Sequence, residues 1–557
     1  MPFGIWDPAS ARSGSTSDAA PSLNGTALLI DEGPVGVDVS IATDVHLLKR
    51  IVYKGEETIL VPQPSDNPND PLQWPRWQKE AAFWTIFFNA IIFAILPGPI
   101  IAPATFLLAG IFDMPLTSIA QLSGYQLLVV GAFGPFVSVL AQKYGKRPQF
   151  LFAATAATIG TAICVAGAEQ LNYQTLLAGR IIQGFGVTAW ESLAVAAVGD
   201  LFYLHERGLR TSILVVALAG TASIVAIISG ALCEGVGWAN LFVALLPIDV
   251  VCLLLTVFML PETQFVRKNV PLSSSVAADD TAEKSAEGQI ERLASATQAT
   301  ALPYTYWQRL RPFPDRPFTN DSVLRLLLAA VAHLANPAVW WILLVSGVLV
   351  CTFVVTAYIL SQIFSVPPYN LGVAANGYFY VGPFLGGLLA VSAGPLCDWT
   401  ARALARRNKG VFESEFRIPV NVLGMLCCGL GWFLFAWRVD HPVATGYYFA
   451  SFCFGLACFG VSVPSTSAGL YILDSFPRQA TAIFVLQMML KNFIFYGFSM
   501  FINTWAAEAG PGAVFRTFGI VTLALMATCV PMYILGKANR RFMHGIYGKY
   551  KIFRAMD

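Results

Sequence analysis

Stretches of about 20 apolar residues recur along the chain and are separated by short polar loops. Six of them begin near Ala81, Ile119, Phe150, Thr175, Thr211 and Leu241, and six more begin near Ala338, Leu371, Phe416, Val443, Gln479 and Gly512. A helix needs about 20 apolar residues to cross the hydrocarbon core of a bilayer. The pattern therefore predicts an all-α membrane protein with twelve transmembrane helices in two six-helix bundles.

Polar stretches divide the chain around these spans. Residues 1–78 are rich in Ser, Asp and Pro and predict a disordered cytosolic tail. The two bundles are expected at 79–262 and 338–536. Between them, residues 263–337 predict a cytosolic linker, because their middle part is poor in apolar and aromatic side chains. Residues 537–557 predict a short cytosolic C-terminal tail.

Lys and Arg gather in alternate loops. They follow spans 2, 4 and 8 and return after the last span, as in Lys146, Arg210, Arg402 and Arg540. Cytosolic loops of membrane proteins carry an excess of Lys and Arg. We therefore expect a multi-pass protein with both termini in the cytosol.

The composition supports this reading and narrows the function. The chain is 56% hydrophobic and 12% charged, which is typical of membrane proteins. Its net charge is only +2 and its basic residues are scattered, so we expect no nucleic-acid partner. The sequence has no G-x-x-x-x-G-K-[ST] phosphate-binding loop. We expect neither an enzyme nor an ATP-driven pump, and neither a cofactor nor a metal.

The two halves echo each other. Residues SVLAQKYGKRP follow span 2 and GPLCDWTAR follow span 8, so that Gln142 matches Asp398 and Lys146 matches Arg402. Similar loops at equivalent places in two six-span halves indicate an internal duplication. We therefore expect the two bundles to be pseudo-symmetric.

Span 4 carries two charges inside an apolar run. Arg180 and Glu191 are eleven residues apart, about three helical turns, so both lie on one face together with Gln183. A charge inside a membrane is costly and marks a candidate functional site. Lys491, in the middle of span 11, is either the counter-ion of Glu191, a structural partner or a group that recognises an anion.

Glu191 is the candidate proton carrier, because burial and a nearby cation act in opposite directions on a carboxyl group. The alternative is a permanently neutralised Glu that holds helices together. Aromatic and polar side chains complete the expected cavity, since aromatic faces attract organic cations. The alternative for each is packing or an interfacial belt. These residues are Asn89, Tyr125, Tyr358, Gln362 and Tyr378.

The loop S-V-L-A-Q-K-Y-G-K-R after span 2 resembles the signature G-x-L-a-D-r-x-G-r-k/r of the major facilitator superfamily, with Gln142 in place of the Asp. Arg180 and Gly184 resemble its R-x-x-x-G element. The resemblance is to fungal twelve-span drug:proton antiporters, near the polyamine and histidinol-type cation transporters. It implies the major facilitator fold and a role for Arg180 in proton coupling, for which packing or snorkelling is the alternative. It also implies a cytosolic gate at Gln142, Gly145, Lys146, Arg147, Asp398 and Arg402.

In that fold span 6 lies outside the central cavity, which favours a structural role for Asp249. The expected function is proton-coupled transport of a small organic cation or amphipathic metabolite by alternating access. Span 5 reads VAIISG and lacks the Gly-Pro pair of antiporters, so a uniporter is an alternative. A receptor without net flux is a third. We expect a monomer in the lipid bilayer of the plasma membrane.

Overall fold

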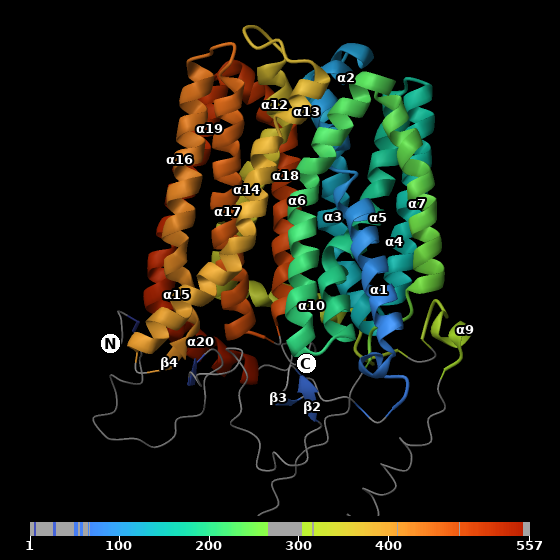
Figure 1. Cartoon of the computed structure of the whole chain (residues 1–557), viewed down its shortest axis with the longest axis vertical. Coiled ribbons are helices and arrows are strands. Elements are labelled where there is room, and N and C mark those ends of the chain that lie inside the picture. Colours follow the sequence, from blue (N-terminus) through green and yellow to red (C-terminus); the bar gives the residue numbers. More distant parts are fainter. Residues whose placement is uncertain are drawn as a thin grey trace, which may run out of the picture.

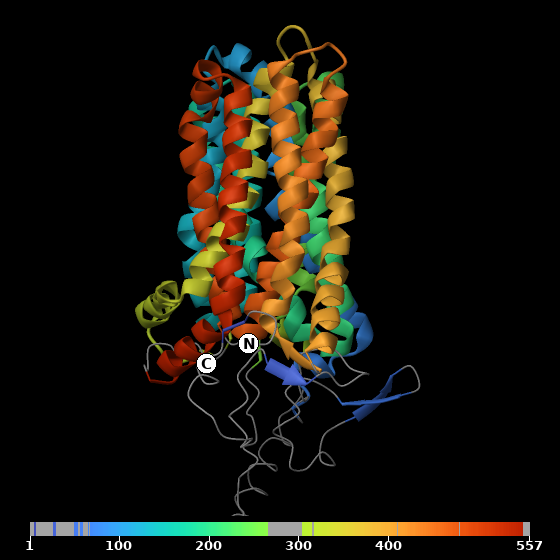
Figure 2. The same ribbon diagram turned by 90° about the vertical axis from the view of Figure 1, so that its left-hand side faces the viewer.

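The computed structural model describes residues 5–6, 26–28, 50–53, 56–59, 65, 67–265, 304–314, 317–408, 410–477 and 479–549, apart from several side chains between residues 204 and 219. Long helices stand side by side in two bundles, one from each half of the chain (Figure 1). The view turned by 90° shows the same side-by-side arrangement of the helices (Figure 2).

The N-terminal bundle begins with a bent span. Its parts are α1 (Arg76–Asn89), a π-helical segment η4 (Ala90–Ile95), a 3₁₀ segment η5 (Pro99–Ala104) and α2 (Thr105–Phe112). Five helices follow: α3 (Leu116–Tyr144), α4 (Lys146–Glu169), α5 (Tyr173–Leu201), α6 (Leu204–Val236) and α7 (Ala239–Met259).

The C-terminal bundle repeats the plan. Its first span joins α11 (Pro337–Ile342), η7 (Leu343–Val348) and α12 (Leu349–Phe364). The second joins α13 (Val373–Tyr378), α14 (Val381–Leu389), η8 (Ala390–Ser392) and α15 (Ala393–Arg407). The others are η9 (Ser414–Val420) with α16 (Asn421–Asp440), α17 (Tyr447–Ser475), α18 (Ala480–Glu508), and α19 (Pro511–Ala527) with α20 (Cys529–Lys549).

Within the described residues, eleven helices are long and apolar enough to cross a membrane. The remaining place in the N-terminal bundle belongs to α6, whose segment Gly220–Val236 is a shorter apolar helix by the same measure. The expected all-helical membrane fold is confirmed. The last helix continues past the expected boundary at residue 536, to Lys549.

Small elements cover one end of the bundles. They include two antiparallel strand pairs, β1 (Thr26–Leu28) with β4 (Val411–Glu413) and β2 (Arg50–Tyr53) with β3 (Glu56–Ile59). The helical ones are η3 (Pro71–Gln73), α9 (Tyr306–Arg309), α10 (Val323–Ala332) and η6 (His333–Ala335). Short pieces of the expected disordered tail thus form strands. Apart from these pieces and residues 5–6, residues 1–64 lie outside the described residues.

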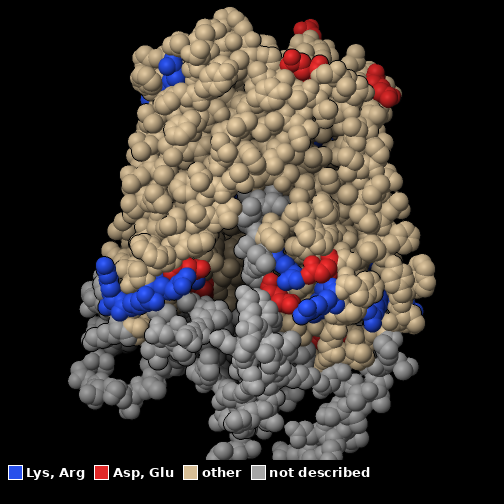
Figure 3. Space-filling model, in the orientation of Figure 1, with Lys and Arg blue, Asp and Glu red and all other residues tan. Residues whose placement is uncertain are grey.

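Most of the charged side chains visible in Figure 3 lie toward that same end, on the lower parts of both bundles, and a few lie at the other end. We call this end the basic end, because it carries the loops that begin at Gly145 and Phe202 and the last turn of α15 with Arg406. The other end is called the opposite end. The surface in Figure 3 is hollowed between the bundles toward the basic end.

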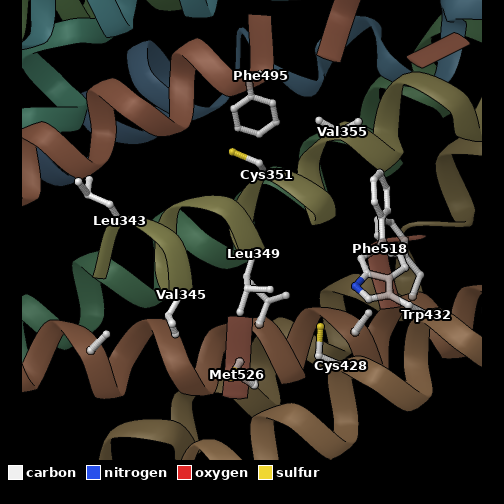
Figure 4. Packing of buried hydrophobic residues seen from close by; sticks show 14 of the residues in the cluster. Leu343, Val345, Leu349, Cys351, Val355, Cys428, Trp432, Phe495, Phe518 and Met526 are labelled. Atoms are coloured by element: carbon white, nitrogen blue, oxygen red, sulfur yellow. The ribbon is translucent and has the colours of Figure 1, made fainter. Parts of the chain in front are cut away.

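The core of the C-terminal bundle shows how apolar residues position its helices. Leu349, Cys351 and Val355 of α12 are fully buried and face residues of three other helices (Figure 4). Phe495 comes from α18, Trp432 from α16, and Phe518 and Met526 from α19. Burial of such large side chains is the main stabilising contribution, at about 1.5–3 kcal/mol for each aliphatic or Phe side chain.

The two bundles meet most closely at the opposite end. In α6, a Cβ atom on Gly230 would lie 2.8 Å from the Cα atom of Gly377 in α13. The backbone N–H of Ala374 donates to Oε2 of Glu234 at 2.8 Å. The hydroxyl oxygens of Thr117 and Thr504 are 3.4 Å apart across α3 and α18. The structure is therefore closed between the bundles at this end.

Candidate functional site

An ion pair joins the two bundles inside the membrane-spanning region. Lys491 Nζ lies 2.5 Å from Glu191 Oε1, linking α18 to α5. The two side chains are 21% and 24% exposed. Each charge interrupts a long apolar helix, and each would be costly to bury alone. The pair neutralises both charges and keeps them within reach of solvent.

Arg180 is not part of this pair. It is completely buried near the opposite end of α5 and is held by neutral groups. Its guanidinium donates to the carbonyl oxygen of Pro97 at 2.6 Å, to Ser123 Oγ at 3.1 Å and to Gln183 Oε1 at 3.1 Å. Because Arg180 and Glu191 are three turns apart, one shared face does not bring them into contact.

The bend in the first span supplies the partner at the shortest distance from Arg180, the carbonyl oxygen of Pro97. Pro97 lies in the turn between η4 and η5, where the regular α-helical hydrogen-bond pattern is interrupted. Proline inside a helix removes hydrogen bonds and bends it. A carbonyl group in such a turn is free to accept from a side chain. Arg180 thus ties the bend in span 1 to α5.

Other expected cavity residues lie at or near the contact between the bundles. The rings of Tyr125 in α3 and Tyr496 in α18 are 5.2 Å apart. Tyr358 in α12 is buried within electrostatic range of Arg180. Gln362 is half-buried and donates from Nε2 to the carbonyl oxygen of Asn503 at 3.2 Å, so its amide nitrogen fastens α12 to α18.

Asn89 does not face a cavity between the bundles. It is completely buried inside the N-terminal bundle, where its Nδ2 donates to Thr256 Oγ1 at 2.7 Å and to the carbonyl oxygen of Cys252 at 3.3 Å. Both partners belong to α7. The expectation of a cavity role for Asn89 is corrected: a lone amide in an apolar helix here finds its partners in a neighbouring helix.

Tyr378 is also misplaced by the sequence analysis. It is 54% exposed and lines an apolar groove whose residues all come from the C-terminal bundle, among them Leu385 and Phe452. The groove lies between α14 and α17, not between the two bundles. Tyr378 therefore belongs to an outward-facing apolar surface, which is the packing or belt alternative for this residue.

Several buried polar groups have no hydrogen-bond partner within the part of the chain that the structure describes. They include the side-chain amides of Gln126 in α3 and Asn492 in α18 and the hydroxyl group of Tyr358. Buried polar groups are almost always paired, so such groups mark places where water or a ligand completes the site. They come from helices that meet between the bundles.

The loop after α3 is organised by a carboxylate that the sequence analysis did not single out. Glu262, just after α7, accepts from the backbone N–H groups of Lys146 and Arg147 at 3.0 Å each. Lys146 Nζ also lies 2.5 Å from Asp200 Oδ2 at the end of α5. Burial raises the pKa of Glu262, and the backbone donors act against that rise. The first turn of α4 is thereby capped by a negative charge.

Arg147 and Gln142 bind the end of α7 and the segments that follow it. The Arg147 guanidinium donates to the carbonyl oxygens of Val257 at 2.8 Å and Leu310 at 2.9 Å. The backbone carbonyl oxygen of Gln142 accepts from Gln264 Nε2 at 3.0 Å. Part of the expected linker is therefore attached to the N-terminal bundle; residues 266–303 lie outside the described residues.

Replacing Gly145 with Ala is expected to destabilise the protein by about 1–3 kcal/mol. Gly145 has φ of +92°, and a Cβ atom there would lie 2.2 Å from Glu262 Oε2. The variant would strain the backbone and displace the capping carboxylate. The readout is the apparent Tm of the purified protein.

Gly110→Ala is the matched control, because a Cβ at Gly110 meets nothing within 4 Å and its helix gains propensity. Equal Tm values for the two variants would contradict the proposed tight fit of Gly145.

The equivalent loop of the C-terminal bundle uses a different arginine from the expected one. Asp398 Oδ1 accepts from Arg417 in η9 at 2.6 Å, and the same guanidinium binds Asp474 Oδ2 at 2.5 Å. Asp474 ends α17 as Asp200 ends α5. Arg402 is exposed, and among the described residues it donates to the backbone oxygen of Asp398 at 3.3 Å. The match of Arg402 with Lys146 is corrected: Arg417 takes the equivalent place.

Two bundles of long apolar helices, joined by an ion pair, define a multi-pass membrane protein. A sequence model of the Major Facilitator Superfamily matches residues 82–491. The chain therefore belongs to the Major Facilitator Superfamily.

The chain resembles several fungal members. It is 23% identical to the MFS transporter cpaT of Aspergillus oryzae, over 85% of this chain and 91% of that protein. It is 25% identical to the probable drug/proton antiporter YHK8 of Saccharomyces cerevisiae, over 70% and 71%. The xylose transporter XylE from E. coli, in a partially occluded inward-open conformation, superimposes with a TM-score of 0.55 at 13% identity, over 81% and 97%. This last likeness shows the fold alone.

Proposed function

We propose that the protein is a proton-coupled secondary transporter of a small organic cation or amphipathic molecule. The observation that carries this proposal is the ion pair between Glu191 and Lys491, which joins the two bundles and stays partly exposed. A carboxylate in this place can bind a proton, an organic cation or the Lys491 ammonium group, and binding of one excludes the others. The name of the yeast relative YHK8, a probable drug/proton antiporter, supports the proton coupling.

Alternating access follows from the way the bundles meet. The structure is closed at the opposite end by the contacts of Gly230, Glu234 and Thr117. Transport requires these contacts to open while the hollow at the basic end closes, as in rocking of two bundles around a central site. Competition between a proton, an organic cation and Lys491 for Glu191 explains how the bundles change their arrangement. When Lys491 loses its contact with Glu191, the bundles are free to move.

The two charged loop networks at the basic end form the proposed gate. One contains Gln142, Gly145, Lys146 and Arg147; Glu262 accepts from the backbone of Lys146 and Arg147, and Gln264 donates to the backbone of Gln142. The other contains Asp398 held by Arg417. The first network ties the start of α4 to the segment after α7 and to the end of α5, and the second ties η9 to α15 and to the end of α17. The excess of Lys and Arg in these loops supports a cytosolic basic end. The plasma membrane remains the proposed location.

Glu191→Gln tests the proposal. The purified protein is placed in lipid vesicles, and uptake of ethidium, whose positive charge is fixed, is followed under an imposed pH gradient of either sign. The parent is expected to show gradient-driven flux that nigericin abolishes in potassium buffer. The Gln variant is expected to lose this flux by at least about tenfold, within the range of ordinary coupling free energies.

Asp440→Asn serves as the control, because Asp440 pairs with Arg516 on the exposed opposite end. It should keep the parent flux. Gradient-driven flux in Glu191→Gln that matches the parent would refute the role of Glu191. Flux in the parent that ignores the pH gradient would favour the facilitator alternative.

A further inference from the structure

A chain of hydrogen bonds crosses the N-terminal bundle and ends at a buried carboxylate. Thr161 Oγ1 in α4 donates to Asp249 Oδ2 in α7 at 2.5 Å. Thr161 Oγ1 in turn accepts from Gln183 Nε2 in α5 at 2.8 Å, and Gln183 Oε1 accepts from Arg180 at 3.1 Å. Asp249, Thr161 and Gln183 thus connect the outer helix α7 with Arg180.

Asp249 is deeply placed and lacks a counter-ion among the described residues. It is 2% exposed and lies ten residues from either end of α7, about 15 Å along the helix axis. Its second oxygen, Oδ1, has no hydrogen-bond partner in the part of the chain that the structure covers. A helix that only needed packing here would not require a carboxyl group at its middle.

Few titratable groups surround this carboxyl group. The thiols of Cys164 in α4 and Cys252 in α7 are near enough to sense its charge. The nearest cation along the hydrogen-bond chain is Arg180, beyond Thr161 and Gln183. From α1, η4 and α6, no described side chain with a charge acts on Asp249.

Protonation of Asp249 would reverse the donor and acceptor roles at its end of this series of hydrogen bonds. An isolated buried carboxylate is costly, and the neutral acid is less so. In the ionised form, every donor from Arg180 onward points toward Asp249, which is the final acceptor. In the neutral form, the acid can donate to Thr161 Oγ1, and the threonine hydroxyl turns to another acceptor, such as a carbonyl one turn earlier in its helix.

This rearrangement reaches the contacts of Arg180. Gln183 would then share Thr161 Oγ1 with a second donor, so its hold on Arg180 would differ between the two protonation states. Arg180 is also bound to Pro97 at the bend of span 1 and to Ser123 in α3. A proton on Asp249 therefore acts on the helices that line the contact between the bundles.

We propose that Asp249 is a second proton-binding site, distinct from Glu191, and that Thr161 and Gln183 couple it to Arg180. This inference rests on the proposed proton-coupled function. The proton is taken from water and returned to water during the transport cycle. Thr161 and Gln183 are positioning residues in this proposal, since they act through Arg180 and Asp249.

The first experiment detects the proton directly and needs no transported substrate. Infrared difference spectra between high and low pH are recorded for the purified full chain in lipid bilayers. The parent is expected to show a protonated-carboxyl band that Asp249→Asn removes and that Glu191→Gln leaves in place. The control Asp440→Asn also leaves the band unchanged. A complete set of carboxyl bands in Asp249→Asn would overturn the proposal.

Thr161→Val tests the coupling with nearly unchanged volume and provides a second variant if Asp249→Asn folds poorly. Loss of the threonine donor removes support for the ionised form. The pH midpoint of the carboxyl band is expected to move upward by about one pH unit, and gradient-driven ethidium flux is expected to fall. A lower Tm with an unchanged midpoint would show a purely structural threonine and would refute the coupling.

The two proposals fail in different ways. If the parent moves ethidium independently of the pH gradient while the band vanishes in Asp249→Asn, the proton site stands and the proposed function falls. If gradient-driven flux depends on Glu191 while Asp249→Asn keeps every band and the full flux, only the second site falls.

Discussion

Arg540→Met is expected to destabilise the C-terminal bundle by about 3–5 kcal/mol. Arg540 in α20 is completely buried and binds two carboxylates, Glu415 at 2.6 and 3.0 Å and Glu413 at 2.8 Å. Both carboxylates are at most 2% exposed. Removal of the guanidinium leaves two like charges buried together with too few partners. The readout is the apparent Tm, followed with a maleimide dye that reacts when buried cysteines become exposed.

The double variant Arg540→Met, Glu415→Gln should recover part of the lost stability, because it removes the carboxylate that has lost its counter-ion while Glu413 keeps its pair with Lys537. Arg325→Met is the matched control. Its pair with Asp321 is largely exposed on the surface, where such pairs contribute about 0–1 kcal/mol. Equal losses of Tm in Arg540→Met and Arg325→Met would contradict the expected contribution of the buried cluster.

Gly230→Leu is expected to prevent closure of the opposite end and to reduce transport by at least about tenfold, a shift of the conformational equilibrium by 1.4 kcal/mol or more. The backbones of Gly230 and Gly377 approach so closely that even a Cβ atom must push the helices apart. Closure is measured by cross-linking cysteines placed at Thr117 and Thr504, whose hydroxyl oxygens are 3.4 Å apart in the closed arrangement. The cross-link yield should fall in the Leu variant.

Gly235→Leu provides the control on the same helix. A Cβ atom at Gly235 meets nothing within 4 Å, so the added side chain leaves the helix crossing intact. Both variants improve helix propensity by a similar amount, and only the crossing distinguishes them. Equal cross-link yields in the two variants would show that closure does not depend on the glycine crossing.

The general fold could be predicted from the sequence, because a bilayer demands apolar stretches of fixed length. The candidate residues Glu191 and Lys491 were also visible, since a charge stands out in an apolar run. Their pairing was one of three alternatives open for Lys491, and the structure shows it. The partners of Arg180 were not visible. Arg180 and Glu191 share a helix face, but the structure gives Arg180 the carbonyl oxygen of Pro97, a contact created by the bend in another span.

Helix orientation was the weaker part of the prediction. In a membrane protein both the lipid-facing surface and the interior are apolar, so the sequence does not show which face of a helix meets the other bundle. Asn89 and Tyr378 were misplaced for this reason. Arg417 was missed because the repeat comparison matched positions along the chain, whereas β4 and η9 bring a later residue to Asp398.

The attachment of Arg147 to Leu310 has a consequence for the order of events during synthesis. Domains form as the chain emerges, the N-terminal part first. All helices of the N-terminal bundle precede Leu310, and so does the segment 266–303. The first bundle can therefore insert with Arg147 already bound to the carbonyl oxygen of Val257, and the contact with Leu310 is added when part of the following connection has been made. If the gene is divided so that the C-terminal fragment begins at Pro337, Leu310 stays with the N-terminal fragment and can still bind Arg147. If it is divided before residue 304, Leu310 lies on the other fragment, and the coexpressed halves lose this contact within the first fragment.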